Sequence, residues 1–102
     1  MKYGKAIRDK IPEIIRASGE NCIVETLTND EFLLELEKKL REEVEEYLQS
    51  KSPVELADMI EVIYRILELR QITLEELDQI RLEKSEKRGG FKNNLYLVET
   101  YS

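Results

Sequence analysis

The fold is decided by residues 40–58, which read LREEVEEYLQSKSPVELAD. Apolar side chains recur before the polar break at 49–53 with the three- and four-residue spacing of a helix. Ser52 followed by Pro53 is the usual start of a second helix, with serine as the N-cap and proline in the first turn. Helices with so short a connection pack as antiparallel neighbours, so this stretch predicts a helical hairpin.

Four carboxylates are placed by this hairpin on the facing sides of its two helices. Glu43 and Glu46 are three residues apart, as are Glu55 and Asp58, so each pair projects from one face, roughly 4.5 Å apart along the axis. In an antiparallel hairpin Glu43 lies level with Asp58, and Glu46 lies level with Glu55. Four converging acids repel one another without a cation, and hard oxygen ligands suit Mg²⁺ or Mn²⁺ with bound phosphates.

The sequence on both sides of this stretch predicts further helices. Apolar spacing and cap signals define helical segments at residues 12–16, 29–48, 53–70 and from 73 to the glycine pair 89–90. Asn29 or Asp30 is the expected N-cap of the second segment, and Thr73 with Glu76 is the expected capping box of the fourth.

Two short runs nearer the ends of the chain are typical of strands. Residues 22–27 and 95–98 are rich in apolar and β-branched side chains, and we expect them to pair with each other. With 102 residues the chain has the size of one small domain. The expected fold is therefore a single, mainly α domain, a helical bundle with a minor terminal strand pair.

The charge of the chain restricts its partners. Charged residues make up 37% of the sequence, and the net charge is −6. Phosphate contacts dominate the affinity of DNA- and RNA-binding proteins, so no nucleic-acid partner is expected. A nucleotide is compatible with this charge, because a metal ion can bridge its phosphates to acidic side chains. No apolar run is long enough to cross a bilayer, so no membrane partner is expected either.

Histidine and cysteine content restricts the chemistry. The sequence has no histidine, which excludes Zn–His sites and Ser-His-Asp or Cys-His catalysis. Acid–base work must therefore come from carboxylates, lysine, tyrosine or metal-bound water. Cys22 is the single cysteine and cannot form an internal disulfide, and no signal peptide is evident, so a reducing, cytoplasmic location is expected.

Simpler explanations exist for each acid taken alone. A solvated helix face accounts for Glu42 and Glu45, which point away from the apolar stripe, and a capping box with Ser52 accounts for Glu55. Glu43, however, falls at the edge of the apolar stripe. Buried carboxylates without a paired base are costly, so two facing acid pairs favour a ligand site.

The spacing of the acids resembles a known signature. EEVEE at 42–46 followed by ELAD at 55–58 is similar to the ExxE…ExxD motif of the all-α nucleoside triphosphate pyrophosphohydrolases, the MazG-like superfamily. One departure lies in the connection, because only eight residues separate Glu46 from Glu55, fewer than is usual in MazG itself. The substrate preferences of MazG are therefore not transferred.

The resemblance extends to both flanks of the hairpin. RDKIPEII at 8–15, and the segment from Lys84 through KRGGF at 87–91, resemble a small single-domain branch of that superfamily. Its members are described as house-cleaning NTP pyrophosphatases or as phosphoribosyl-ATP pyrophosphohydrolase-like proteins. The resemblance therefore covers nearly the whole chain.

The resemblance implies a hydrolase with a divalent metal centre. Proteins of this superfamily hold Mg²⁺ with the four acids, here Glu43, Glu46, Glu55 and Asp58, and split NTPs between the α and β phosphates into NMP and pyrophosphate. Such a metal grips phosphate oxygens and lowers the pKa of a water that attacks phosphorus. Without histidine, a carboxylate such as Glu46 or Glu42 is the expected general base.

The leaving pyrophosphate needs positive charge. The candidate phosphate contacts are the basic side chains of the two flanking motifs, Lys84, Lys87, Arg88, Arg8 and Lys10. Arg88 is the first choice, because a guanidinium can form two parallel hydrogen bonds with a phosphate. The alternative explanation for the cations at 84–88 is that positive charge favours a helix C-terminus.

The segment 53–70 is apolar on nearly every side. In so small a domain, such a helix calls for a partner subunit. A homo-oligomer, dimer or tetramer, is therefore expected, and subunits of the resembling superfamily pair through their helices and often complete each other's sites. Two other functions fit the sequence, namely phosphoribosyl-ATP hydrolysis and a non-catalytic helical interaction module with an acidic surface.

Overall fold

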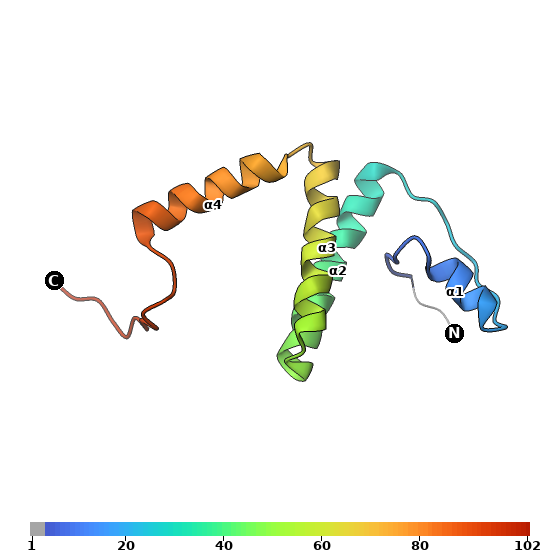
Figure 1. The fold of residues 1–102 in the computed structure, drawn as a ribbon, viewed down its shortest axis with the longest axis horizontal. Helices are drawn as coiled ribbons and strands as arrows, with labels where there is room; N and C mark the ends of the chain where they lie inside the picture. Colours follow the sequence, from blue (N-terminus) through green and yellow to red (C-terminus); the bar gives the residue numbers. More distant parts are fainter. Residues whose placement is uncertain (1–3) are drawn as a thin grey trace. The chain divides into compact units, whose positions relative to one another are not determined.

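Two antiparallel helices form the centre of the fold. The computed structural model describes residues 4–102, which contain four helices, α1 (Ile11–Ala17), α2 (Asn29–Ser50), α3 (Pro53–Leu69) and α4 (Leu74–Arg88). The helices α2 and α3 lie side by side (Figure 1). The mainly α fold class and the helical hairpin are therefore confirmed. None of these four helices combines the length and the apolar composition needed to cross a bilayer.

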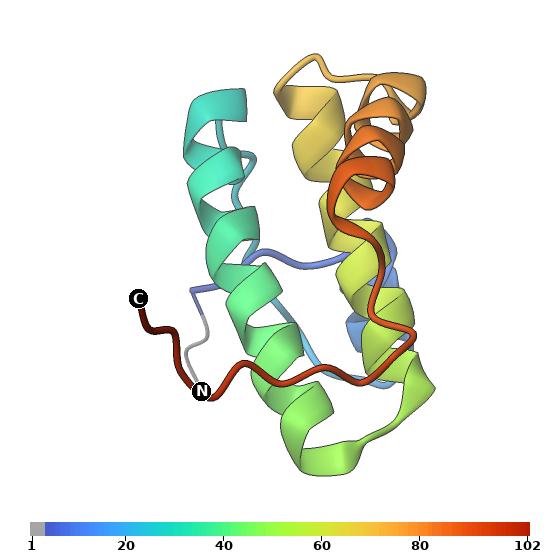
Figure 2. The ribbon, with the colours of Figure 1, turned by 90° about the vertical axis from the view of Figure 1, so that its left-hand side faces the viewer.

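A short turn connects α2 and α3 (Figure 2) and determines which residues of the two helices face each other. Lys51 follows α2 in the left-handed conformation, with φ 58°, and its N–H donates to the Tyr47 carbonyl at 2.7 Å. Ser52 is the N-cap of α3, because its Oγ accepts from the Val54 N–H at 3.2 Å, while its own N–H donates to the Ser50 Oγ at 3.1 Å. With two residues between the helices, facing positions are closely fixed.

The start of α2 differs from the predicted one. Thr28, rather than Asn29 or Asp30, is the N-cap. Its Oγ1 accepts from the Glu31 N–H at 3.2 Å, and a Glu31 carboxylate oxygen accepts from the Thr28 N–H at 3.1 Å. This reciprocal box needs a glutamate three residues after the cap, which neither Asn29 nor Asp30 has.

The core of the hairpin is small. Leu36 of α2 and Val62 of α3 are buried together with Ala6, which precedes α1. The partly buried side chains around them are Phe32, Leu40, Ile66 and Leu69. Ala6 thus fastens the N-terminal segment to the hairpin, and this contact determines where the next few residues can reach.

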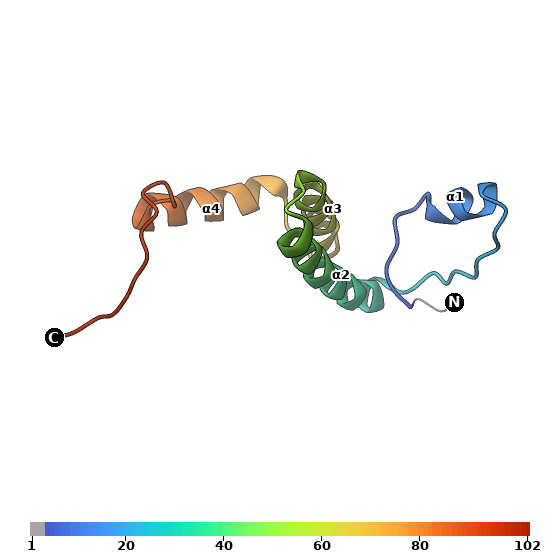
Figure 3. The same cartoon turned by 90° about the horizontal axis from the view of Figure 1, so that it is seen from below.

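The predicted strand pair is wrong, because residues 4–102 contain no strand. Residues 22–27 lie in the irregular connection between α1 and α2 (Figure 3), and residues 95–98 lie in the irregular C-terminal tail. Ile23 is 97% exposed and Leu95 is 90% exposed. A two-stranded pair is marginal in water unless it packs on an apolar surface, so strand propensity alone does not produce it.

Contacts within the chain divide it into two compact units, one that ends at Ile72 and one that comprises Thr73–Ser102. The second unit consists of α4 and the tail. As predicted, Thr73 is the N-cap of α4, with its Oγ1 accepting from the Glu76 N–H at 3.1 Å. The Glu76 carboxylate accepts from the Thr73 hydroxyl at 3.2 Å, which differs from the reciprocal bond to the Thr73 N–H in the predicted capping box. The helix ends at Arg88 and is followed by Gly89, whose φ of 82° suits glycine. The single domain predicted from the sequence stays a prediction.

Candidate metal centre

Three carboxylates of the hairpin converge on one small volume. Oxygen atoms of Glu43 on α2 and of Glu55 and Asp58 on α3 all lie within 4.8 Å of one another. Ligands on opposite sides of one hard divalent cation are separated by roughly 4–5 Å, twice a metal–oxygen distance of about 2.1–2.5 Å. The three side chains therefore fit one such cation with little rearrangement.

Glu43 is the buried member of this group. The residue is 5% exposed, and its Oε2 has no hydrogen-bond partner in the described part of the chain. A buried carboxylate oxygen without a donor is costly unless a proton or a cation satisfies it. The Glu43 carboxyl group therefore needs either a proton or a bound cation.

The electrostatics of the group oppose full ionisation. Burial, followed by the charges of Glu46 and Asp58 and a hydrogen bond with Glu55, raises the pKa of Glu43 to about 7, and the charge of Lys39 only partly offsets this. Burial also raises the pKa of Glu55, although its hydrogen bond with Glu43 acts in the opposite direction. The crowding of carboxylates on the hairpin thus raises the pKa of both Glu43 and Glu55.

Glu46, the fourth predicted ligand, lies beside this group. Glu46 is exposed, and the three carboxylates that approach within 4.8 Å do not include it, although its charge acts on both Glu43 and Glu55. Glu42, the other predicted base, is half-buried, with a carboxylate oxygen 4.0 Å from the Lys39 Nζ. A hydrogen bond with Glu55, which raises the pKa of Glu55, places Glu46 at the edge of the three candidate ligands.

The capping box that offered a simpler explanation for Glu55 is not the arrangement in the structure. The N–H of Ser52, which such a box would use, donates to Ser50 instead. The carboxylate of Glu55 lies in the acidic group. Its position is therefore explained by the hairpin and not by a local cap.

One predicted phosphate contact, Arg8, is paired with a candidate ligand. An Nη2 of Arg8 donates to the Asp58 Oδ1 at 2.8 Å, between residues fifty positions apart in the chain. The two side chains are 56% and 30% exposed. Lys10, from the same segment, is exposed at the N-cap position of α1. Of these two cations, the structure thus brings Arg8 to the acidic group.

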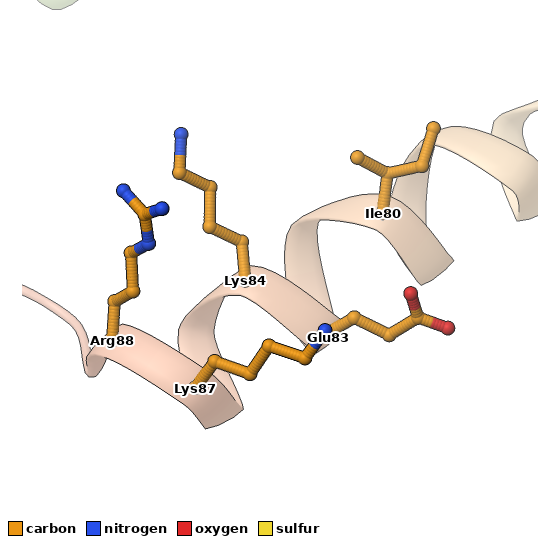
Figure 4. A pocket seen from close by; sticks show the side chains of 5 residues that line it. All are labelled: Ile80, Glu83, Lys84, Lys87 and Arg88. Atoms are coloured by element: carbon orange, nitrogen blue, oxygen red, sulfur yellow. The ribbon is translucent and has the colours of Figure 1, made fainter.

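The other predicted phosphate contacts belong to the second unit. Lys84, Lys87 and Arg88 line an open hollow on α4 together with Ile80 and Glu83. Figure 4 shows the side chains of Lys84 and Arg88 projecting from the same side of the helix, as expected for residues four apart. Three neighbouring cations on this surface can bind an anion. They also lie in the last turns of α4, where the helix dipole stabilises positive charge.

Comparisons with known proteins give one partial similarity. A protein of Mycolicibacterium smegmatis described as uncharacterized is 52% identical to this chain over 40 residues, which span 39% of this chain and 41% of that protein. No protein-family model matches the chain, and no solved structure matches it. The resemblance to the MazG-like superfamily therefore stays a prediction from the sequence motifs.

Proposed function

We propose that the chain is a metal-dependent nucleoside triphosphate pyrophosphohydrolase of the MazG-like type. The observation that carries the proposal is the convergence of Glu43, Glu55 and Asp58 around a buried carboxylate oxygen that lacks a donor. The acid spacing and the two flanking motifs support the same assignment. Mg²⁺ is the expected ion, and Mn²⁺ is the alternative, because both accept carboxylate ligands beside phosphates.

Each residue of the site has a proposed role. A divalent cation held by Glu43, Glu55 and Asp58 would neutralise phosphate charge and lower the pKa of a water molecule. Glu46 is the proposed acceptor of the proton of that water, because it is exposed at the edge of the group. Glu42 is the second choice, since its carboxylate faces a lysine.

Two sources of positive charge are proposed for the leaving pyrophosphate. Arg8 already lies beside the acidic group, and Lys84, Lys87 and Arg88 form the cationic surface of α4. The overall reaction consumes one water and one NTP and releases NMP and pyrophosphate. Cations at the leaving group stabilise the charge that develops there as the bond breaks.

Pyrophosphate release tests the proposal. Canonical and modified NTPs and phosphoribosyl-ATP are each supplied with Mg²⁺, with Mn²⁺ and with EDTA. Release is expected only with metal, and Glu43→Gln and Asp58→Asn are expected to abolish it. Glu37→Gln, which changes an exposed acid of α2, is the matched control and is expected to keep wild-type turnover. If no substrate gives metal-dependent release of pyrophosphate, the proposal is refuted. Release from phosphoribosyl-ATP alone would favour phosphoribosyl-ATP as the substrate.

A stripe of apolar side chains favours a second role for the hairpin, in assembly. Leu56, Ile60 and Tyr64 recur every four residues on α3 and are 42%, 49% and 47% exposed. At 100° per residue they lie on the side of α3 away from the buried Val62. This stripe supports a proposed homo-oligomer. It equally suits a non-catalytic interaction module, which would bind no divalent metal and release no pyrophosphate.

A further inference from the structure

The acidic group, which consists of Glu43, Glu55 and Asp58, already forms an ion pair with an arginine of its own chain. Arg8 lies 2.8 Å from an oxygen of Asp58, and Asp58 belongs to the three carboxylates that approach within 4.8 Å. A guanidinium is charged at every accessible pH, so it compensates part of the negative charge. The buried Glu43 Oε2 still has no hydrogen-bond partner in the described structure, so this compensation is incomplete.

The path of the chain explains how Arg8 reaches Asp58. Ala6, which is 7% exposed, packs in the core of the hairpin. Arg8 follows two residues later, and α1 begins at Ile11. The cation is therefore carried by a short irregular segment between a core anchor and a helix. Because the Arg8 side chain is 56% exposed, it can move without disturbing the core.

We propose that Arg8 is an exchangeable counter-ion of the acidic group, which pairs with Asp58 in the metal-free protein and gives it up when a divalent cation binds. The inference rests on the metal centre proposed above and adds a coupling between metal binding and the N-terminal segment. Two cations that share one carboxylate repel each other at this range. By linkage, Arg8 weakens metal binding by the same factor by which metal weakens the Arg8–Asp58 pair.

Mn²⁺ binding to the full chain, measured by calorimetry at low ionic strength, tests the exchange. Arg8→Gln is expected to bind Mn²⁺ roughly three- to tenfold more tightly, the scale of removing one unit charge roughly 6–12 Å from a divalent ion in water, as for a displaced arginine. Arg8→Lys keeps the charge and is expected to stay nearer wild type. Arg16→Gln removes an exposed arginine of α1 and is the matched control, with Kd expected within about twofold of wild type.

A second measurement follows the guanidinium itself. The side-chain NMR signal of Arg8, identified by its loss in Arg8→Gln, is expected to change from a protected to a solvent-exchanging position as Mg²⁺ is added to the wild-type protein. An arginine with a merely structural role would keep its signal unchanged. A signal that stays fixed while Mg²⁺ saturates the protein would overturn the exchange.

The outcomes separate the two proposals. Wild-type protein that binds no Mn²⁺ at millimolar concentration would overturn the metal centre itself. Wild-type protein that binds Mn²⁺, with Arg8→Gln no tighter than Arg16→Gln, would overturn the exchange alone. Circular dichroism checks that each variant keeps its helices. If Arg8→Gln does not fold, the NMR titration of the wild-type protein decides, with the Arg8 signal identified by its loss in Arg8→Lys.

Discussion

The Nζ of Lys39 lies 3.9 Å from Oε1 of Glu43, one turn along the same helix. At this distance the lysine supplies positive charge to the buried carboxyl group without supplying a hydrogen bond. The charge is not sufficient, because burial and neighbouring carboxylates still raise the pKa of Glu43 to about 7. A carboxyl group in this state can lose its proton to solvent and bind a cation in its place at little cost near neutral pH.

The raised pKa of Glu43 predicts how stability depends on pH. The pKa is about 7 in the folded protein against an ordinary value of 4.5, so the folded state binds more protons between these values. The contribution of this group to the free energy of unfolding therefore falls as the pH rises from 4.5 through 7. In EDTA, Glu43→Gln is expected to be more stable than wild type above this window, by about 1–3 kcal/mol, and the difference should vanish toward the acidic end.

Urea denaturation across this pH range measures the effect. Glu45→Gln, which changes an exposed acid on the same helix, serves as the control and should follow the wild-type profile. Parallel profiles for wild type and Glu43→Gln would show that Glu43 titrates normally in the folded protein.

Short-range signals account for what the sequence predicted well. Ser52 starts α3 as expected, and the hairpin brings Glu43 close to Glu55 and Asp58, as the antiparallel register requires. Their role as metal ligands stays a prediction. The approach of Lys39 to Glu43 was also within reach of the sequence, since lysine and glutamate four residues apart share a helix face.

Long-range packing explains what the sequence did not predict. The Arg8–Asp58 pair joins residues fifty positions apart, and it depends on the burial of Ala6 against the hairpin, which no local pattern indicates. The predicted pairing of residues 22–27 with 95–98 is wrong because a local pattern was given too much weight. Its local pattern was favourable, but exposed residues such as Ile23 have no apolar surface to cover.

Glu46→Gln and Glu42→Gln distinguish the two candidate bases. Loss of the general base is expected to lower kcat by about 10²–10⁴-fold, and the exposed position of Glu46 makes Glu46→Gln the variant expected to show this loss. The measurement is kcat of each variant and of the wild type at saturating Mg²⁺ and at one pH. A larger loss in Glu42→Gln would transfer the role to Glu42.

Arg88 is the predicted phosphate contact on α4. Arg88→Ala is expected to lower kcat/KM by roughly 10²-fold, the scale of one lost transition-state contact, and Arg88→Lys should recover only part of this. Arg81→Ala is the matched control, because Arg81 lies on the same helix and pairs with Asp78 at 3.5 Å. Full activity of Arg88→Ala would leave only the helix-end explanation for this cation.

The exposed stripe on α3 predicts an oligomer that a single charge disrupts. Ile60 is the middle residue of the stripe and is 49% exposed, so Ile60→Asp would place a carboxylate at the centre of the proposed interface. Burying an unpaired charge there costs several kcal/mol, so the variant is expected to dissociate at least about tenfold more readily. Ile23→Asp is the control, because Ile23 is 97% exposed in the connection before α2. Light scattering from micromolar protein measures the mass of both variants and of the wild type. A stable wild-type monomer would contradict the oligomer. An oligomer that Ile60→Asp leaves unchanged would place the interface elsewhere.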